Sequence, residues 1–548
     1  MGAEPLNVAA NSPGRHMSSS PTDTLERIFP RCSALIREDL RRTIDLTDEG
    51  KNALEALIGS LDGKALAALP PYLPDLARLE WSRYCVRAGA AALPDSVDTL
   101  AANPTIQVLD LAWSGLTCSL EGSMPPAGPE RRFERVLVWL DPRTLKPQSR
   151  PAADEDLLVL KIVMESIDPE TVAAAGNLPV GAVDAALDRA VINGLLIAPP
   201  SRLRRETSVF SGRCNVPDSL VATPSFTLQW HITQVCDLHC KHCYDRSDRS
   251  PLSYDQAIHV LDDLRRFCRD RNVQGAVSFT GGNPLLHPRF NDIYHAAVER
   301  NFTTAILGNP ATRERIMEIL AIAPPAFFQV SLEGLPEHND SIRGKGHFDR
   351  IMVFLDLLRS LKVSSMVMLT LTSANMDQVL PLAELLRDRT DIFHFNRLAL
   401  FGEGANLTMA DRTRYRQFLE DYMAAARSNP VMGAKDNLMN ILLREQGADL
   451  FGGCTGYGCG AAFNFVSLLA DGEVHACRKL PSRIGNIHEA TLADIYDSEL
   501  ARRYRLGPSS CSGCEIRAAC GGCLASAKSN GLDIFLDRDP YCFFDRRP

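Results

Sequence analysis

Three cysteines stand close together in the segment QVCDLHCKHCYDR, residues 234–246. They are Cys236, Cys240 and Cys243, spaced C-x3-C-x2-C and followed directly by an aromatic residue, Tyr244. Thiolates at such short spacings can face a common centre, and iron-sulfur clusters are held by cysteine in this way. Three ligands on a four-iron cluster leave one iron open to a chelating ligand, whereas structural zinc sites are closed by four ligands.

A second group of cysteines lies near the end of the chain, where regular patterns are few. Its members are Cys454, Cys459, Cys477, Cys511, Cys514, Cys520, Cys523 and Cys542. Eight thiolates are enough to hold two four-iron clusters completely. Zinc is the alternative for both groups, because C-x2-C pairs also bind zinc and because His239 or His242 could complete the first site.

The other five of the 16 cysteines are scattered singly, and we expect them to pack as small hydrophobic side chains. They are Cys32, Cys85, Cys118, Cys214 and Cys268. No apolar run approaches the roughly 18 to 20 residues that span a bilayer, and the polar first stretch lacks the apolar centre of a signal peptide. We therefore predict a cytoplasmic protein with reduced thiols and no membrane partner.

The composition is that of a globular protein with several domains. The chain has 548 residues, of which 45% are hydrophobic and 23% charged, and it exceeds the length of one ordinary domain. The formal net charge of -8 argues against a surface built broadly to hold nucleic acid or anionic lipid. Nucleic acid is therefore not expected as a partner.

Residues 223–406 alternate strand-like and helix-like segments in a regular order. Six apolar strand segments occur, and each but the last is followed by a helical pattern: FTLQWHIT, GAVSFT, TTAILG, AFFQVSLE, SSMVMLTLT and IFHFNRLALFG. This order predicts parallel strands with right-handed crossovers, and hence an α/β barrel or part of one. Such barrels carry their chemistry on the loops after the strands, and the three-cysteine segment follows the first strand.

The rest of the chain divides by composition and periodicity into further parts. We expect a disordered N-terminus at 1–24, a helical domain at 25–104, a winged-helix-like domain at 105–206, a linker at 207–222, a helical bridge at 407–450 and a Cys-rich domain at 451–548. Two apolar strands, three helical stretches and a short apolar strand give the winged-helix-like pattern. A winged fold favours DNA binding, but acidic residues crowd this part and phosphate contacts need positive charge.

The cysteine segment, its aromatic neighbour and its place after the first strand resemble the radical S-adenosylmethionine (SAM) enzymes. FTGGNP, after the second strand, resembles the family's Gly-Gly-Glu-Pro turn, whose backbone receives the amino group of SAM. The turn consists here of Gly281, Gly282, Asn283 and Pro284. Glycines let the backbone approach a ligand closely. Asn283 departs from the commoner Glu, which affects the role of that side chain but not of the backbone.

Two later stretches extend the resemblance along the barrel. VSLEGLPEHNDSIRG resembles the segment after the fourth strand in the family's peptide-modifying branch. It implies that Ser331 and Glu333 meet the ribose of SAM and that Arg343 meets its carboxylate. ALFGEGA implies that Gly402 lies near the adenine, and Tyr244 belongs by its position to the same cofactor-binding set.

The C-terminal cysteines resemble the SPASM domain, which carries two auxiliary [4Fe-4S] clusters. The resemblance rests on Gly472-x4-Cys477 and on the C-x2-C-x5-C run that starts at Cys511. The family's pattern assigns Cys454, Cys459, Cys477 and Cys523 to the first cluster, and Cys511, Cys514, Cys520 and Cys542 to the second. The last spacing of the run has two residues where the family commonly has three.

The combined resemblance covers residues 223–548 and points to radical SAM/SPASM maturases of ribosomally made peptides. It implies a partial (β/α)6 barrel and an oxidoreductase that uses a 5'-deoxyadenosyl radical to modify a precursor peptide. It also implies a one-electron donor such as flavodoxin or ferredoxin. Among peptide maturases, a small fold like that expected at 105–206 recognises the leader of the substrate as an added strand. A purely structural role and DNA binding are the alternatives for that part.

The type of modification is narrowed by two further segments. GGNP together with ACRKLPSRIGNI resembles the selenobiotic type, which implies thio(seleno)oxazole formation on peptides that contain Cys or selenocysteine. Thioether crosslinking is the runner-up. Formylglycine formation is less expected, because the family's sulfatase maturases have Asp where this chain has Arg478. A cluster-based redox or DNA-binding regulator is the hypothesis of another class, and SAM cleavage by the reduced protein discriminates the two.

Overall fold

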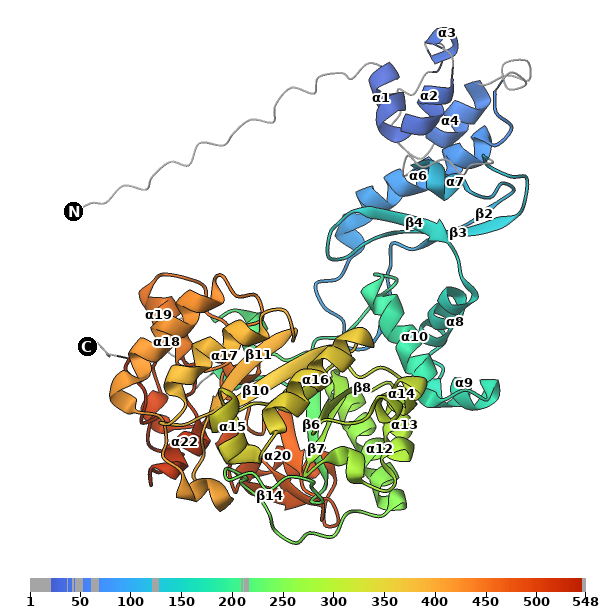
Figure 1. Ribbon diagram of the computed structural model, residues 1–548. Helices are drawn as coiled ribbons and strands as arrows, with labels where there is room; N and C mark the ends of the chain where they lie inside the picture. The colour runs from blue at the N-terminus through green and yellow to red at the C-terminus, as the bar shows by residue number, and fades with distance from the viewer. Residues whose placement is uncertain are drawn as a thin grey trace, which may run out of the picture. The chain divides into compact units, whose positions relative to one another are not determined.

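The computed structural model describes residues 21–36, 38–41, 44, 53–60, 69–120, 128–207, 210 and 216–544. Contacts divide the chain into two compact units, Met1–Pro169 with Ala186–Pro199 and Glu170–Ala185 with Pro200–Pro548 (Figure 1). Most of the N-terminus that we expect to be disordered, and Cys214 in the expected linker, lie outside the described residues.

The first unit begins with short helices around an apolar core. They are α1 (Pro21–Ile28), α2 (Pro30–Leu35), α3 (Glu38–Arg41), α4 (Ala53–Ser60) and α6 (Leu73–Ala88). Leu25, Leu57 and Leu76 are among the side chains buried between them. The buried carboxylate of Glu80 accepts hydrogen bonds from the backbone N–H groups of Arg31 and Cys32 at 2.7 and 3.0 Å, and so fixes the first turn of α2 against α6.

A three-stranded antiparallel sheet follows, in the order β2-β3-β4. Its strands are β2 (Gln107–Leu111), β3 (Glu134–Leu140) and β4 (Pro147–Pro151), and α7 (Leu116–Leu120) stands between the first two. The chain continues through α8 (Asp154–Met164), α9 (Pro169–Gly176) and α10 (Val180–Ile192) to β5 (Leu196–Ile197), which pairs with β1 (Ala101–Ala102). The pattern did not predict β4, because this edge strand is polar and begins and ends with proline.

The second unit holds the six parallel strands that the sequence predicts, side by side in chain order (Figure 1). They are β6 (Ser225–Thr233), β7 (Gln274–Gly281), β8 (Thr303–Leu307), β9 (Phe328–Ser331), β10 (Ser365–Leu371) and β11 (Ile392–Arg397). The helices between them are α12 (Tyr254–Arg271), α13 (Phe290–Val298), α14 (Arg313–Ile322), α15 (Pro336–Arg343), α16 (His347–Ser360) and α17 (Val379–Leu386), after α11 (Asp218–Val221). The expected partial α/β barrel is confirmed.

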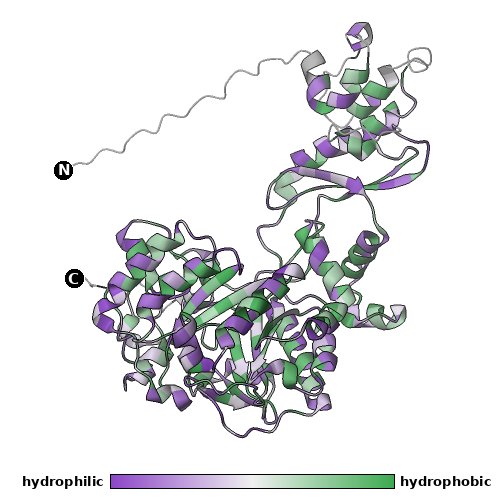
Figure 2. Ribbon diagram, in the orientation of Figure 1, coloured by the Kyte–Doolittle hydropathy of each residue, from purple (hydrophilic) through white to green (hydrophobic). Residues whose placement is uncertain are grey.

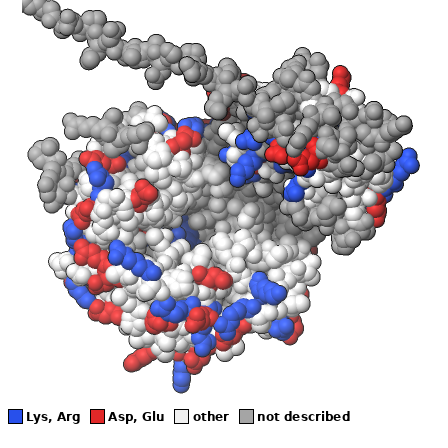
Figure 3. Space-filling model, turned by 90° about the horizontal axis from the view of Figure 1, so that it is seen from above, with Lys and Arg blue, Asp and Glu red and all other residues white. Residues whose placement is uncertain are grey.

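The helices cover the barrel because each has one apolar face. In α12 the side chains of Leu261, Leu264 and Phe267 are buried at helical spacing, and a capping box of Ser253 and Gln256 starts the helix. Apolar residues accordingly concentrate on the strands and on the inward faces of the helices, while polar residues lie outside (Figure 2). On the coloured part of the face in Figure 3, basic and acidic side chains are interspersed.

The C-terminal region has more regular structure than the sequence suggests. It contains α18 (Arg412–Ala426), α19 (Met439–Glu445), α20 (Leu492–Asp497), α21 (Glu499–Leu506) and α22 (Leu524–Ser529), and the strands β12 (Phe465–Leu468), β13 (Glu473–His475) and β14 (Arg483–Asn486). β12 pairs in parallel with β6, so these strands extend the barrel sheet beyond its first strand. The cysteines of this region are thereby brought beside the barrel. Across the described residues, no helix is long and apolar enough to cross a membrane.

Candidate active site

The three-cysteine loop opens on a cavity of about 840 Å³ at the ends of the parallel strands. Cys236, Cys240 and Cys243 all line it. Five of the predicted SAM-binding residues line it as well: Tyr244, Gly281, Gly282, Ser331 and Arg343. The other four predicted residues, Asn283, Pro284, Glu333 and Gly402, lie next to this lining rather than in it. A cavity of this size suits a cofactor or a comparably sized ligand.

Two glycines let the cysteine loop lie against the end of β7. A Cβ on Gly281, whose φ is +121°, would stand 2.2 Å from the Thr233 oxygen, and one on Gly282 would stand 2.2 Å from the Val235 oxygen. The Gly282 N–H donates to the Thr233 carbonyl at 2.8 Å, and the Asn283 N–H donates to the Val235 carbonyl at the same distance. Any larger side chain would push the two loops apart.

Asp237, inside the cysteine loop, is held by two asparagines. Asn283 Nδ2 donates to its Oδ1 at 3.1 Å, and Asn309 Nδ2 donates to the same oxygen at 2.6 Å. Asn309 Nδ2 also lies 3.6 Å from Cys236 Sγ. The side chain of Asn283 therefore fixes the loop. We did not predict Asn309, although its place directly after the third strand is where barrel chemistry is expected.

Arg343 and Glu333 form a buried ion pair beside the second cysteine. Arg343 Nε and Nη2 donate to Glu333 Oε1 at 2.8 and 2.6 Å, and Arg343 Nη1 lies 3.6 Å from Cys240 Sγ. The other carboxylate oxygen of Glu333 accepts the Thr370 N–H at 2.8 Å. Burial opposes ionisation of Glu333, but the charges of His242 and Arg343 keep its pKa below the usual value. Both oxygens of Glu333 thus have protein partners, and Arg343 faces the cavity.

The two histidines between the cysteines have partners other than the three thiols. His239 Nδ1 meets the exposed Arg246, whereas His242 Nε2 lies 3.2 Å from Arg343 Nη2 and 3.3 Å from Glu333 Oε1. Burial lowers the pKa of His242, although the neighbouring Glu333 carboxylate opposes this shift. Its Nδ1 is buried without a hydrogen-bond partner among the described residues.

Tyr244 is anchored below the cysteine loop. Its hydroxyl lies 3.0 Å from Nε2 of the buried His231, and burial lowers the pKa of His231 to about 3. A Cβ on Gly402, whose φ is +55°, would stand 2.5 Å from the Tyr244 carbonyl oxygen. The Glu403 N–H donates to the Cys243 carbonyl at 2.8 Å. The turn after β11 therefore packs against the far end of the cysteine loop.

Four C-terminal thiols surround a second, smaller cavity of about 60 Å³. They are Cys454, Cys459, Cys477 and Cys523, the set that the sequence assigns to the first auxiliary cluster. Burial, together with the neighbouring thiols of the set, raises the pKa of Cys459 to about 12 and that of Cys477 to about 11. A group that carries positively charged iron removes this penalty, because it binds the thiolate form.

The second auxiliary set is interleaved with the first along the chain, since Cys523 of the first set lies between Cys520 and Cys542 of the second. Burial raises the pKa of Cys520, and the nearby thiols of Cys542 and Cys514 raise it further. Burial lowers the pKa of Arg517, whereas the nearby thiols of Cys511 and Cys514 oppose this shift. The Cys459 N–H donates to the Cys520 carbonyl at 2.9 Å, which joins the two sets through the backbone.

Buried polar groups hold the first set against the barrel. Arg397, at the end of β11 and 4% exposed, donates to both oxygens of Asp539 at 2.9 and 2.7 Å. The Cys523 N–H donates to Asp539 Oδ2 at 2.8 Å, and the Cys454 N–H donates to Asn437 Oδ1 at 2.6 Å. Arg397 therefore positions Asp539, and Asp539 positions the backbone of Cys523 in the first auxiliary set.

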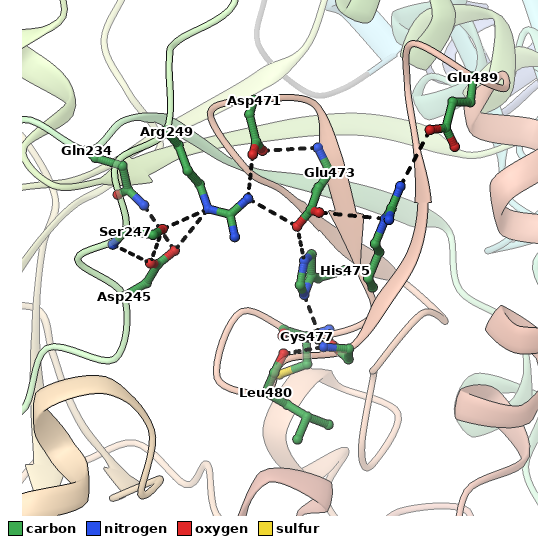
Figure 4. A network of polar contacts seen from close by, with 12 residues as sticks. Gln234, Asp245, Ser247, Arg249, Asp471, Glu473, His475, Cys477, Leu480 and Glu489 are labelled. Carbon is green, nitrogen blue, oxygen red and sulfur yellow. Dashed lines mark hydrogen bonds and ion pairs between the residues drawn. The ribbon is translucent and has the colours of Figure 1, made fainter.

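A polar network joins the cysteine loop to Cys477 (Figure 4). Arg249, beyond the loop, donates to Asp471 at 2.5 Å and to Glu473 at 3.1 Å. His475 Nε2 lies 3.2 Å from Glu473, and its Nδ1 accepts the Ser482 N–H at 3.0 Å. The Ser482 hydroxyl in turn accepts the Cys477 N–H at 3.1 Å. The network fixes the first auxiliary set relative to the barrel loop.

These surroundings fit cofactors larger than a single ion. Within the described part of the chain, no group of three or more Cys, His, Asp or Glu side chains converges closely enough to hold one metal ion. Four thiols around one cavity suit a four-iron cluster. On the barrel side, three thiols, the cation of Arg343 and the unpartnered Nδ1 of His242 suit a cluster with a polar ligand beside it.

A parallel barrel with three thiols on its first loop and further thiol sets behind it defines a radical enzyme with auxiliary clusters. The radical SAM superfamily model matches residues 230–386, and the model of an iron-sulfur cluster-binding domain, SPASM, matches residues 459–523. The chain is a radical SAM enzyme with a C-terminal SPASM domain. Its cofactors are SAM, a [4Fe-4S] cluster that binds SAM and auxiliary [4Fe-4S] clusters, and the zinc alternative for the two cysteine groups is wrong.

Curated relatives share about a quarter of their residues with this chain. The AdoMet-dependent heme synthase of Methanosarcina barkeri is 24% identical over 58% of this chain and 96% of its own length. Mycofactocin maturase MftC of Mycolicibacterium smegmatis is 27% identical over 58% of this chain and 82% of its own. The antilisterial bacteriocin subtilosin biosynthesis protein AlbA of Bacillus subtilis is 26% identical over 57% of this chain and 67% of its own.

Proposed function

We propose that this chain modifies a ribosomally made precursor peptide that contains cysteine or selenocysteine, forming a thio(seleno)oxazole or a thioether. The observation that carries the proposal is a shared wall: Asn396, Arg397 and Lys479 line both the large cavity and the four-thiol cavity. A peptide in the large cavity is separated from the first auxiliary set by these side chains. A substrate thiol, or an electron released from the product, therefore has a short route to that set.

The relatives support a peptide rather than a porphyrin as the substrate. One is named a maturase and another a bacteriocin biosynthesis protein. The heme synthase, the maturase and the bacteriocin biosynthesis protein each match 57 to 58% of this chain, so about two fifths of the chain has no counterpart in any of them. Extra chain is what recognition of a large substrate requires.

We assign the sheet of the first unit to recognition of the peptide leader as an added strand. In the order β2-β3-β4, two strands lie at the edges. β4 begins with Pro147 and ends with Pro151, which lack the N–H groups that a paired strand needs. β2 has no proline, and Val108 on it is half exposed. We therefore place the leader along β2.

In the proposed mechanism, Cys236, Cys240 and Cys243 hold the SAM-binding cluster. Arg343, oriented by Glu333, binds the SAM carboxylate, and the backbone after β7 receives its amino group. When bound and reduced, the cluster and SAM together supply reductive cleavage of SAM and abstraction of a substrate hydrogen atom. The barrel wall keeps water from the reacting atoms. A small one-electron donor such as flavodoxin or ferredoxin delivers the electron.

Anaerobic reconstitution tests the proposal. We expect about twelve irons per chain, and 5'-deoxyadenosine after addition of dithionite and SAM. The triple change of Cys236, Cys240 and Cys243 to Ala should remove about four irons and all 5'-deoxyadenosine, whereas Cys118→Ala, at an exposed single cysteine, should remove neither. Full clusters without SAM cleavage would instead favour a redox or DNA-binding regulator. A Cys-containing peptide encoded beside the enzyme, treated in the same assay, should show the mass change of a new ring or crosslink.

A further inference from the structure

The charged side chains that line the large cavity are mostly basic. Among the described residues, the acidic ones are Asp245 and Asp248, and the basic ones are Arg246, Arg249, Arg343, Arg397, Arg478 and Lys479. A cavity with this balance attracts anions, and its walls screen charge less than open water does. We therefore asked which of these cations are free to meet a ligand.

Most of the basic side chains already have partners in the protein. The pairs are Arg343 with Glu333, Arg249 with Asp471 and Glu473, and Arg397 with Asp436 and Asp539. Arg246 is exposed and donates to the Cys240 carbonyl at 3.0 Å. Asp245 is held by Gln234 at 3.0 Å and by Ser247 at 2.5 Å. Arg478 and Lys479 remain, and neither forms an ion pair with any described residue.

These two cations face the cavity from the SPASM side. Lys479 Nζ donates to the Arg397 carbonyl at 2.9 Å and lies in the wall toward the four-thiol cavity. Arg478 lies toward His231 on β6. Burial is the main cause of the lowered pKa of His231, and the charge of Arg478 is the next. Both side chains are half buried. They follow β13, whereas Arg343 is the last residue of α15 and lies beside Cys240.

We propose that Arg478 and Lys479 bind a carboxylate of the peptide substrate, so that the substrate carries Asp or Glu beside the residue that reacts. This inference rests on the proposed function and names the class of sequence on which it acts. SAM brings one carboxylate, for which Arg343 is the partner. The second pair of cations therefore serves a second anion, and a planar guanidinium next to an ammonium suits a carboxylate side chain.

Binding of two synthetic peptides to the reconstituted, oxidised full-length protein tests the inference. The probes are an acetylated, amidated, fluorescent pentapeptide with Glu on both sides of a central Cys, and its counterpart with Gln. With SAM present, fluorescence anisotropy should show at least about tenfold tighter binding of the Glu peptide. R478Q/K479Q should bind the two peptides equally and bind SAM as before. The control R313Q/K528Q, at exposed residues away from the cavity, should keep the preference.

A single substitution at Arg478 serves as a second variant in case the double variant misfolds. It should preserve the fold, because Arg478 donates no hydrogen bond to a described residue. R478E should reverse the preference, binding a peptide with Lys in place of Glu more tightly than the Glu peptide. Equal or unmeasurable binding of both peptides by the parent would overturn the inference, as would a preference that persists in R478Q/K479Q. Weakened SAM binding by R478Q/K479Q would also overturn the inference, because it would show that Arg478 and Lys479 bind SAM. Production of 5'-deoxyadenosine by the parent is scored separately, so loss of the carboxylate preference leaves the proposed function standing.

Discussion

Arg343 is bound through two nitrogens to one oxygen of Glu333, and its remaining nitrogen lies 3.6 Å from the Cys240 thiol. Glu333 is only 2% exposed and its second oxygen accepts a backbone N–H. The acidic residue that resemblance assigned to the ribose is therefore fully engaged in holding a cation at the edge of the cavity. Removal of the Glu333 carboxylate should leave the Arg343 guanidinium as an uncompensated buried charge.

Glu333→Ala should destabilise the protein by about 3 to 5 kcal/mol, because it leaves the Arg343 guanidinium buried without its partner. The double variant E333A/R343M should recover much of this loss, since it removes both charges. Thermal melting of the two variants measures the difference, with Glu337→Ala, an exposed change in α15, as the control. If E333A melts at the same temperature as E337A, the ion pair does not contribute to stability.

Gly282→Ala should disrupt the site of the SAM-binding cluster. The new Cβ would lie 2.2 Å from the Val235 oxygen and 2.7 Å from the Gln234 oxygen, and backbone atoms cannot move aside as flexible side chains can. We expect the reconstituted iron content to fall by about four per chain, with the SPASM clusters retained. Gly59→Ala, where a Cβ meets no atom within 4 Å, is the matched control and should bind iron like the parent. An unchanged iron content in G282A would show that the loop adapts.

The assignment of thiols to two auxiliary clusters predicts separable losses. Cys523→Ser should abolish the cluster whose other thiols surround the 60 Å³ cavity, and Cys511→Ser should abolish the other cluster. Each change should lower the iron content by about four. Electron paramagnetic resonance of the reduced variants should show that different signals disappear. Loss of the same signal in both variants would mean that one cluster draws ligands from both sets.

Arg205 is a buried cation that should raise the reduction potential of the first auxiliary cluster. Its Nη2 donates to the carbonyls of Tyr457 and Cys459 at 2.7 and 2.6 Å, and its guanidinium lies 4.2 Å from the ring centroid of Phe463. Burial lowers its pKa to about 10, and no described carboxylate forms an ion pair with it. An anionic cluster beside Cys459 would offset this charge, since nearby charge tunes cluster potentials.

Arg205→Met should therefore make the midpoint potential of that cluster more negative. A potentiometric titration followed by electron paramagnetic resonance measures the shift. Arg502→Met is the control, because Arg502 is exposed and paired with Glu206, so that solvent screens its charge. Equal potentials in the parent and in R205M would show that Arg205 acts only as a structural donor to the two carbonyls.

The sequence predicted those parts of the fold that have local periodicity. The six barrel strands follow from apolar runs alternating with helical patterns, and the four thiols around the 60 Å³ cavity follow from the resemblance to SPASM. β12 has four residues and is stabilised by pairing with β6, more than 200 residues earlier, so no local pattern marks it. The strand β4 escaped prediction for another reason, because it is polar and begins and ends with proline.

Side-chain partners were harder to predict than site membership. Arg343 lines the cavity, but nothing in the local pattern indicates that Glu333 pairs with it. That Glu333 meets the ribose of SAM stays a prediction. Asn309 was missed because a single polar residue after a strand is common. Cys118 is exposed although we expected it to be packed, since a single cysteine in an amphipathic stretch does not reveal which face is buried.

His347 should make the stability of the protein fall at acidic pH. Burial lowers its pKa from 6.5 to about 4, and its Nδ1 lies 3.1 Å from the Asn339 amide, so the folded protein holds it neutral. Above pH 6.5 neither state is protonated and the residue has no pH effect. Between pH 6.5 and pH 4 the imidazole is protonated in the unfolded chain but neutral in the folded protein. The free energy of unfolding therefore falls as the pH is lowered, by about 3 kcal/mol at pH 4. Thermal melting from pH 7 to pH 5 should therefore show a steeper decline for the parent than for His347→Asn, which keeps an acceptor for Asn339. Parallel pH profiles would mean that His347 is protonated in the folded protein.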